Sequence, residues 1–158
     1  MENDDRSAED LYRTLLEEAK SARDRDDLAG ALIAHARSAA RGDSKSDRAC
    51  ALVSLGATLR YAGRLNEALD VLRDARSMTA SVNVQVAAMT CEIAILCDQG
   101  KDEDARRVGE SALELAEGPF LLNALGRAWM EGFRATGIVD FRERAEDYFE
   151  QAGSAAVA

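Results

Sequence analysis

The most reactive side chains in this sequence are one histidine, His35, and three cysteines, Cys50, Cys91 and Cys97. Nucleophilic catalysis needs a nucleophile, a base and a group that orients the base. A zinc site draws mainly on several Cys and His ligands held together. Cys91 and Cys97 are six residues apart, which places them on different faces of a helix. With a single histidine, the chain has few residues that could serve as the base of a catalytic site or as further zinc ligands. We therefore expect no enzyme, no metal and no cofactor.

Other side chains and glycines that could take part in catalysis or ligand binding have ordinary structural explanations. The adjacent carboxylates Glu17-Glu18 and Asp26-Asp27 are typical of exposed helix surfaces. The glycines are isolated and form no phosphate-binding loop. An odd number of cysteines argues against a disulfide framework and favours buried thiols in a reducing compartment.

The net charge and the N-terminal residues limit which partners and which cellular location we expect for the protein. The chain has 20 Lys and Arg against 29 Asp and Glu, a net charge of −9, with no basic run. Binding to nucleic acid or to an anionic membrane surface normally requires a basic patch, so neither is expected. The acidic start, residues 1–6, differs from a secretory signal, and no apolar stretch approaches the ~20 residues of a membrane span. We therefore expect a cytoplasmic protein.

Apolar residues recur every three or four positions along nearly the whole chain, as at Leu65, Ala68, Leu72 and Ala75. This period predicts an all-α fold. We expect a disordered acidic N-terminus over 1–6, one helical domain over 7–153 and a flexible tail over 154–158. The predicted helices cover approximately 7–23, 26–41, 46–62, 65–78, 83–98, 102–116, 119–135 and 140–153.

Several residues predict where helices begin and end. Gly63, Gly100 and Gly137 follow predicted helices, where a C-terminal glycine is favourable. Pro119 suits the first turn of a helix, and Ser44 or Ser46 suits an N-cap. Asp140 with Glu143 resembles a capping box for the last helix.

An alanine pair spaced by seven residues occurs once in each predicted helical hairpin. The first members recur at intervals of 39, 37 and 40 residues, which indicates an internal repeat. The pairs are Ala29 and Ala36, Ala68 and Ala75, Ala105 and Ala112, and Ala145 and Ala152.

Residues 55–75 resemble a tetratricopeptide repeat (TPR), in Leu55-Gly56, Leu59, Gly63, Ala68, Leu72 and Ala75. The resemblance extends to the hairpins at 83–116 and 119–153 and, through the alanine spacing alone, to 7–41. It implies a right-handed α-α superhelix, a TPR-like solenoid of about eight helices in four antiparallel hairpins. Glu92-Ile93 replaces the Leu-Gly pair, and the spacing exceeds the usual ~34 residues, so the repeats are divergent. The alternative is a plain helical bundle.

In this family the first helix of each hairpin lines a concave groove, so the resemblance implies a non-catalytic scaffold or adaptor that binds a peptide or partner protein. Alternatives are that the small residues merely let first helices pack, or that the array is a regulatory sensor of a small molecule or signalling peptide. The Lys/Asn clamp for chaperone-tail carboxylates is absent. The implied groove residues are Thr14, Glu18, Ser21, Val53, Ala57, Arg60, Thr90, Ala94, Cys97, Asn123, Arg127 and Met130.

Aromatic residues gather after position 119, which suggests self-association of the last hairpin as a homodimer or structural module. The alternative is that its longer helices simply enclose larger side chains. The candidates are Phe133, Phe141, Tyr148 and Phe149. The second helices at 65–78 and 102–116 carry charged residues expected on solvated faces, among them Asp102, Glu103, Arg106, Arg107 and Glu110.

Overall fold

The computed structural model describes residues 30, 34 and 44–157, with side chains through Ser154. The predicted helices at 7–23 and 26–41, His35, and Thr14, Glu18 and Ser21 lie essentially outside this part, although Gly30 and Ala34 are helical. Contacts divide the chain into two compact units, Met1–Val84 and Gln85–Ala158, here called the N-terminal and C-terminal units.

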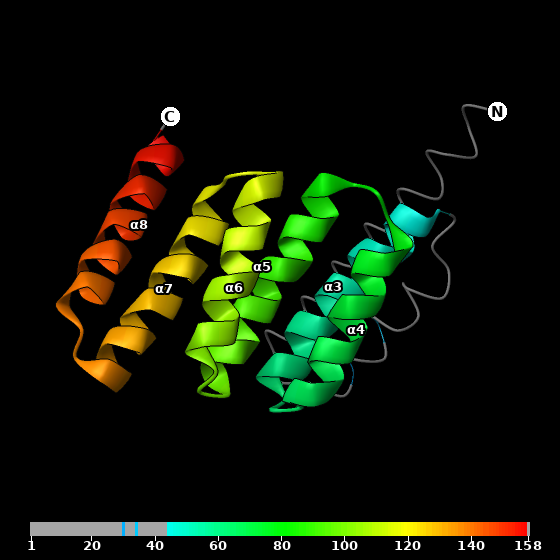
Figure 1. Ribbon diagram of the computed structural model, residues 1–158. Coiled ribbons are helices and arrows are strands. Elements are labelled where there is room, and N and C mark those ends of the chain that lie inside the picture. The colour runs from blue at the N-terminus through cyan, green and yellow to red at the C-terminus, as the bar shows by residue number, and fades with distance from the viewer. Residues whose placement is uncertain (1–29, 31–33, 35–43, 158) are drawn as a thin grey trace. The chain divides into compact units, whose positions relative to one another are not determined.

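The described residues form six helices and no strand, which confirms the all-α prediction for this part of the chain. Their ends agree with the predicted ranges to within one residue, except that α8 runs four residues beyond the expected end at 153. The superhelical arrangement stays a prediction. The helices are α3 (Lys45–Tyr61), α4 (Leu65–Met78), α5 (Val82–Asp98), α6 (Asp102–Leu115), α7 (Pro119–Thr136) and α8 (Val139–Val157) (Figure 1).

Left-handed glycines follow three of these helices. Gly63, Gly100 and Gly137 have φ angles of 78°, 74° and 71°, a region that other residues enter at a cost because of their Cβ atom. A Cβ built at any of the three meets no atom within 4 Å, so conformation and not space explains the glycine. The predicted C-terminal glycines are therefore confirmed.

The helix starts follow the predictions in two cases of three. Ser44 is the N-cap of α3, and its hydroxyl accepts a hydrogen bond of 3.1 Å from the backbone N–H of Asp47. Pro119 is the first residue of α7. Asp140 lies inside the first turn of α8, which begins at Val139, so the predicted capping box with Asp140 as N-cap is wrong.

We expect Gly137→Ala to lower the free energy of unfolding by about 1 kcal/mol, because alanine is strained at positive φ. Gly153→Ala provides the matched control with the opposite sign. Gly153 lies within α8 with open space around its Cα, so alanine there raises helix propensity by up to ~1 kcal/mol. Urea unfolding of both variants measures the difference, and equal effects would contradict the assignment of Gly137 as a conformational cap.

Close contact within the α3–α4 and α7–α8 hairpins depends on one glycine opposite one large side chain. A Cβ on Gly56 of α3 would lie 2.7 Å from Leu72 Cγ of α4. A Cβ on Gly126 of α7 would lie 2.7 Å from Phe149 Cε1 of α8. Neither space can hold a methyl group unless its neighbour moves, so glycine on the first helix and a bulky residue on the second are complementary.

The α5–α6 hairpin reverses this arrangement. Ile93 occupies the position on α5 that glycine takes in the other hairpins, and Gly109 on α6 faces it, with its built Cβ 3.5 Å from Ile93 Cδ1. The same Cβ would lie only 2.4 Å from Leu125 Cδ1 of α7. Gly109 therefore makes room mainly for Leu125 of the next hairpin, whereas a Cβ there would meet Ile93 at an ordinary contact distance.

The repeated alanines of the second helices are buried in all three described hairpins. Each is exposed by 2% or less, as the repeat predicted: Ala68, Ala75, Ala105, Ala112, Ala145 and Ala152. In the C-terminal unit, α7 packs against both α6 and α8. Its residues Leu121, Leu122 and Leu125 are essentially inaccessible to solvent and form the centre of that core.

Candidate functional site

The predicted groove residues are divided between the two units, so each group is considered within its own unit. Val53, Ala57 and Arg60 lie on α3 of the N-terminal unit, at helical spacing, and all three are partly exposed. In the C-terminal unit, Thr90, Ala94 and Cys97 lie on α5, and Asn123, Arg127 and Met130 lie on α7.

An ion pair joins the predicted faces of α5 and α7. The guanidinium of Arg127 donates a hydrogen bond of 2.8 Å to the carboxylate of Asp98, which lies one turn beyond Ala94. The hydroxyl of Thr90 donates to the carbonyl of Val86 in its own helix, 2.8 Å away. This surface is here called the α5–α7 face, and its residues are Thr90, Ala94, Asp98, Asn123, Arg127 and Met130.

Exposure varies along this face. Asn123 is exposed, and Thr90, Ala94, Arg127 and Met130 are partly exposed, so their side chains are available to a partner. Cys97 differs, because it is only 7% exposed and lies in the core. Burial raises the pKa of its thiol to about 11, with further contributions in the same direction from the carboxylates of Glu131, Asp98 and Asp102, opposed by Arg127.

We expect Cys97 to resist alkylation in the folded protein. A pKa of about 11 leaves about a thousandth of the thiol ionised at pH 8, and only the thiolate reacts with iodoacetamide. Mass spectrometry should show its alkylation slower in the native protein than in urea by more than about a hundredfold. Cys50 and Cys91, which are partly exposed, serve as internal comparisons. Native labelling of Cys97 as fast as theirs would contradict its burial.

The aromatic residues of the last hairpin contact their own unit. Trp129 and Phe141 pack edge to face, with ring centroids 5.0 Å apart. The guanidinium carbon of Arg106 lies 5.0 Å from both ring centroids, and that of Arg144 lies 4.8 Å from the Trp129 centroid. These cation–π contacts join α6, α7 and α8.

Arg106 therefore differs from the solvated residue that the charge pattern predicted. Its side chain is 14% exposed, it forms an ion pair with Asp102, and it approaches the Ala128 carbonyl at 3.5 Å. A Cβ on Gly132 would collide with its guanidinium. The expectation that Arg106 faces solvent is thus wrong, and Asp102 is only partly exposed, whereas Glu103, Arg107 and Glu110 are exposed as predicted.

The four residues proposed for self-association have intramolecular contacts. Phe133 lies 5.6 Å from the guanidinium carbon of Arg142, and Phe141 packs on Trp129. Tyr148 donates a hydrogen bond of 3.2 Å to Glu110, and Phe149 fits against Gly126 while remaining 39% exposed. The most exposed aromatic residue in the described part is Phe120, at 83%.

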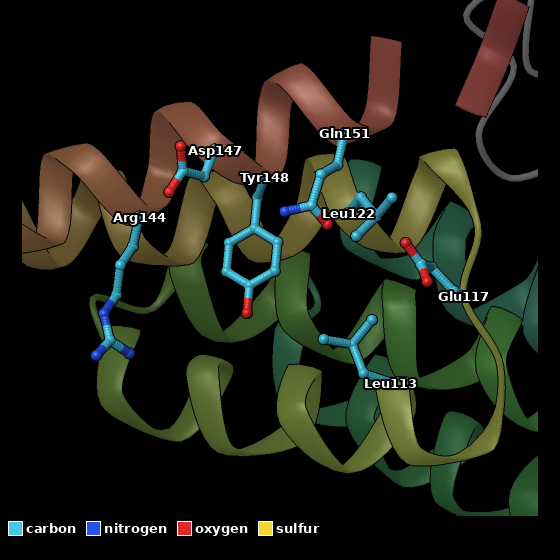
Figure 2. A pocket seen from close by; sticks show the side chains of 7 residues that line it. All are labelled: Leu113, Glu117, Leu122, Arg144, Asp147, Tyr148 and Gln151. Atoms are coloured by element: carbon cyan, nitrogen blue, oxygen red, sulfur yellow. The ribbon is translucent and has the colours of Figure 1, made fainter. Parts of the chain in front are cut away.

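A pocket of about 430 Å³ opens between α6 and α8. Leu113 of α6 and Leu122 of α7 supply apolar walls, and Glu117 comes from the segment that joins these helices. Figure 2 shows the Tyr148 ring extending from α8 toward α6 and Glu117 reaching in from the opposite end to Arg144. The lining residues, here called the α6–α8 pocket, are Leu113, Glu117, Leu122, Arg144, Asp147, Tyr148 and Gln151.

Charge and burial act together at Tyr148. Burial raises the pKa of its hydroxyl, and the negative charge of Glu110 and the hydrogen bond to it raise that pKa further. This pocket was not among the sites predicted from the sequence. The spacing of Arg144, Asp147, Tyr148 and Gln151 places them on one face of a helix and could have indicated a shared site. The predicted groove, however, included residues of first helices only.

The described residues contain neither a metal-ligand cluster nor a helix that could span a membrane. No three His, Cys, Asp or Glu side chains there are grouped closely enough to hold a metal ion. None of these helices combines the length and apolarity needed to cross a membrane. Neither the protein-family models nor the curated proteins contain a match to this chain.

Proposed function

We propose that this chain is a non-catalytic protein-interaction module of the tetratricopeptide-repeat type, in which the α5–α7 face binds a peptide segment of a partner protein. The observation that carries the proposal is the ion pair between Asp98 and Arg127. It joins two faces that the repeat frame independently places on first helices, the ones that line the binding groove in that family.

The composition of the face indicates the kind of segment. Ala94 and Met130 offer small and flexible apolar surface, while Asn123 and Arg127 provide hydrogen-bond donors beside it. Because the Thr90 hydroxyl is already bonded within α5, it adds little polarity. An amphipathic helix or an apolar extended segment suits such a surface better than a strongly charged one.

Repeated glycine–bulky contacts and buried alanines support the repeat type. The buried alanines occur in each described hairpin, and the glycine–bulky contacts hold together the two helices of the α3–α4 hairpin and of the α7–α8 hairpin. The odd number of cysteines, with Cys97 buried in the core, is typical of a reducing compartment, so we place the action of the module in the cytoplasm.

A displayed random-peptide library, selected on the full chain, tests the proposal without knowledge of the partner. Selected peptides, resynthesised and measured by fluorescence polarisation, should bind Ala94→Glu at least about tenfold more weakly, because the carboxylate replaces apolar contact. The control is Ala135→Glu, an exposed alanine next to the last residue of α7, more than two helical turns beyond Arg127 and outside the α5–α7 face. Equal binding to both variants, or no enriched peptide, would refute the α5–α7 face.

Self-association is the second candidate, favoured by the exposure of Phe120 and Phe149. Light scattering coupled to size exclusion measures it directly. Dimers that revert to monomers with Phe120→Ser would support this candidate, and a strict monomer at tens of micromolar would dismiss it.

A further inference from the structure

We propose that the α6–α8 pocket binds the arginine side chain of a partner peptide. This site is separate from the α5–α7 face, since the two share no residue, and it does not depend on the function proposed for that face. Its volume of about 430 Å³ lies within the roughly 300–1,000 Å³ typical of ligand pockets.

Two carboxylates on the pocket rim form no ion pair with any described residue. Glu117 and Asp147 are both exposed, and neither forms an ion pair in the part of the chain that the structure describes. The carboxylate of Glu110, which accepts the Tyr148 hydrogen bond, adds a third negative charge next to the pocket. The excess of negative charge favours a cationic occupant and disfavours a carboxylate or phosphate.

The basic residue of the pocket leaves this balance negative. Arg144 stands at the opposite end from Glu117 (Figure 2), with its guanidinium held over the Trp129 ring. Its single charge compensates one of the three carboxylates, and the whole chain carries a net charge of −9. Opposite charge therefore guides a basic segment both toward the protein and into the pocket.

The apolar walls select the form of the cation. Leu113 and the deeply buried Leu122 can cover an aliphatic stem while its charged end reaches the rim. A purely apolar side chain would instead desolvate Glu117 and Asp147 without compensation.

Arginine suits the pocket better than lysine. Acceptor oxygens belong to Glu117, Asp147 and Gln151, which lie at separate points of the lining, and a planar guanidinium with five donors can reach more than one of them. The ring of Tyr148 also extends into the gap between α6 and α8, where a guanidinium can stack on it (Figure 2).

The test uses the full chain and pentapeptides Ac-Ala-Leu-X-Leu-Ala-amide at 150 mM salt, with X as arginine, lysine, citrulline or glutamate. Citrulline has the shape of arginine without its charge. Trp129 is the single tryptophan and lies against Arg144, so its fluorescence reports occupancy of the pocket. We expect the arginine peptide to bind at least about tenfold more tightly than the citrulline peptide, with lysine between them and no binding of glutamate.

Glu117→Gln and Asp147→Asn should each weaken binding of the arginine peptide about fivefold. The matched control is Glu143→Gln, an exposed carboxylate of α8 outside the pocket, which should change binding less than about twofold. Chemical-shift changes of backbone amides should centre on residues 113–122 and 144–151. Ala94→Glu should leave this binding unchanged, so failure of the α5–α7 face and failure of the pocket give different results.

Four results would overturn the proposal: equal affinity for arginine and citrulline, an equal loss with Glu143→Gln, shift changes centred elsewhere, or no binding at millimolar peptide. An equal loss with Glu143→Gln would mean that net charge alone attracts the peptide. Loss of binding in Ala94→Glu but not in Glu117→Gln would assign the peptide to the α5–α7 face instead.

Discussion

Gly109→Val is expected to lower the free energy of unfolding by about 3 kcal/mol. A Cβ at this position would lie 2.4 Å from Leu125 Cδ1 and close to Ile93 Cδ1. Both neighbours are completely buried, so they cannot move aside into solvent. Overpacking of a dense core typically costs about 1–3 kcal/mol, and valine adds a second branch to the clash. Valine has a higher helix propensity than glycine, but this offsets only a few tenths of a kcal/mol of the cost.

Urea unfolding followed by circular dichroism measures this effect. Glu114→Val, at an exposed position of α6, controls for the helical preference of valine and should change stability by less than about 0.5 kcal/mol. Adding Leu125→Ala to Gly109→Val should recover part of the loss, because the smaller side chain makes room for valine. A loss in Gly109→Val no larger than in the control would show that α6 does not pack closely on α5 and α7.

Arg106→Gln is expected to lower the free energy of unfolding by about 2 kcal/mol. The substitution removes two cation–π contacts, with Trp129 and Phe141, and leaves the partly buried Asp102 without its ion-pair partner. Breaking a buried ion pair typically costs about 3–5 kcal/mol, and partial access to solvent at Asp102 reduces that figure.

The neighbouring arginine is a matched control on the same helix. Arg107 forms ion pairs with Glu103 and Asp104, yet its side chain is 71% exposed, so Arg107→Gln should cost less than about 0.5 kcal/mol. Arg106→Lys keeps the charge but loses the planar guanidinium and should fall between the two. Equal effects of the Gln substitutions at 106 and 107 would contradict a structural role for the cluster around Trp129.

Local features of the sequence were sufficient to predict the described helices. Gly63, Gly100 and Gly137 end helices because they adopt a backbone conformation that depends on the residue itself. The period of Leu and Ala residues placed the helix limits to within a residue, except at the end of α8. The alanine spacing also identified residues that are buried, since small side chains at a fixed interval imply a repeated close contact.

Features that depend on a neighbouring helix were predicted less well. Glu92-Ile93 looked like a weakened repeat, whereas the glycine of that hairpin is Gly109 on the second helix, where it makes room for Leu125 of α7. Arg106 and Arg107 are adjacent and chemically identical, but one packs on Trp129 and the other is exposed. The resemblance to the repeat family placed Cys97 in an open groove, whereas it is buried in the core.

For this protein the sequence alone determined the helical class, the helix limits and the small residues between helices, because these follow from periodicity and backbone preference within a few residues. Only the tertiary structure decided which charged and polar side chains are covered and where a pocket opens. Burial of Arg106 and the lining of the α6–α8 pocket depend on residues from three helices that are distant in the chain. Solvent exclusion is a property of that assembled neighbourhood, and no single helix encodes it.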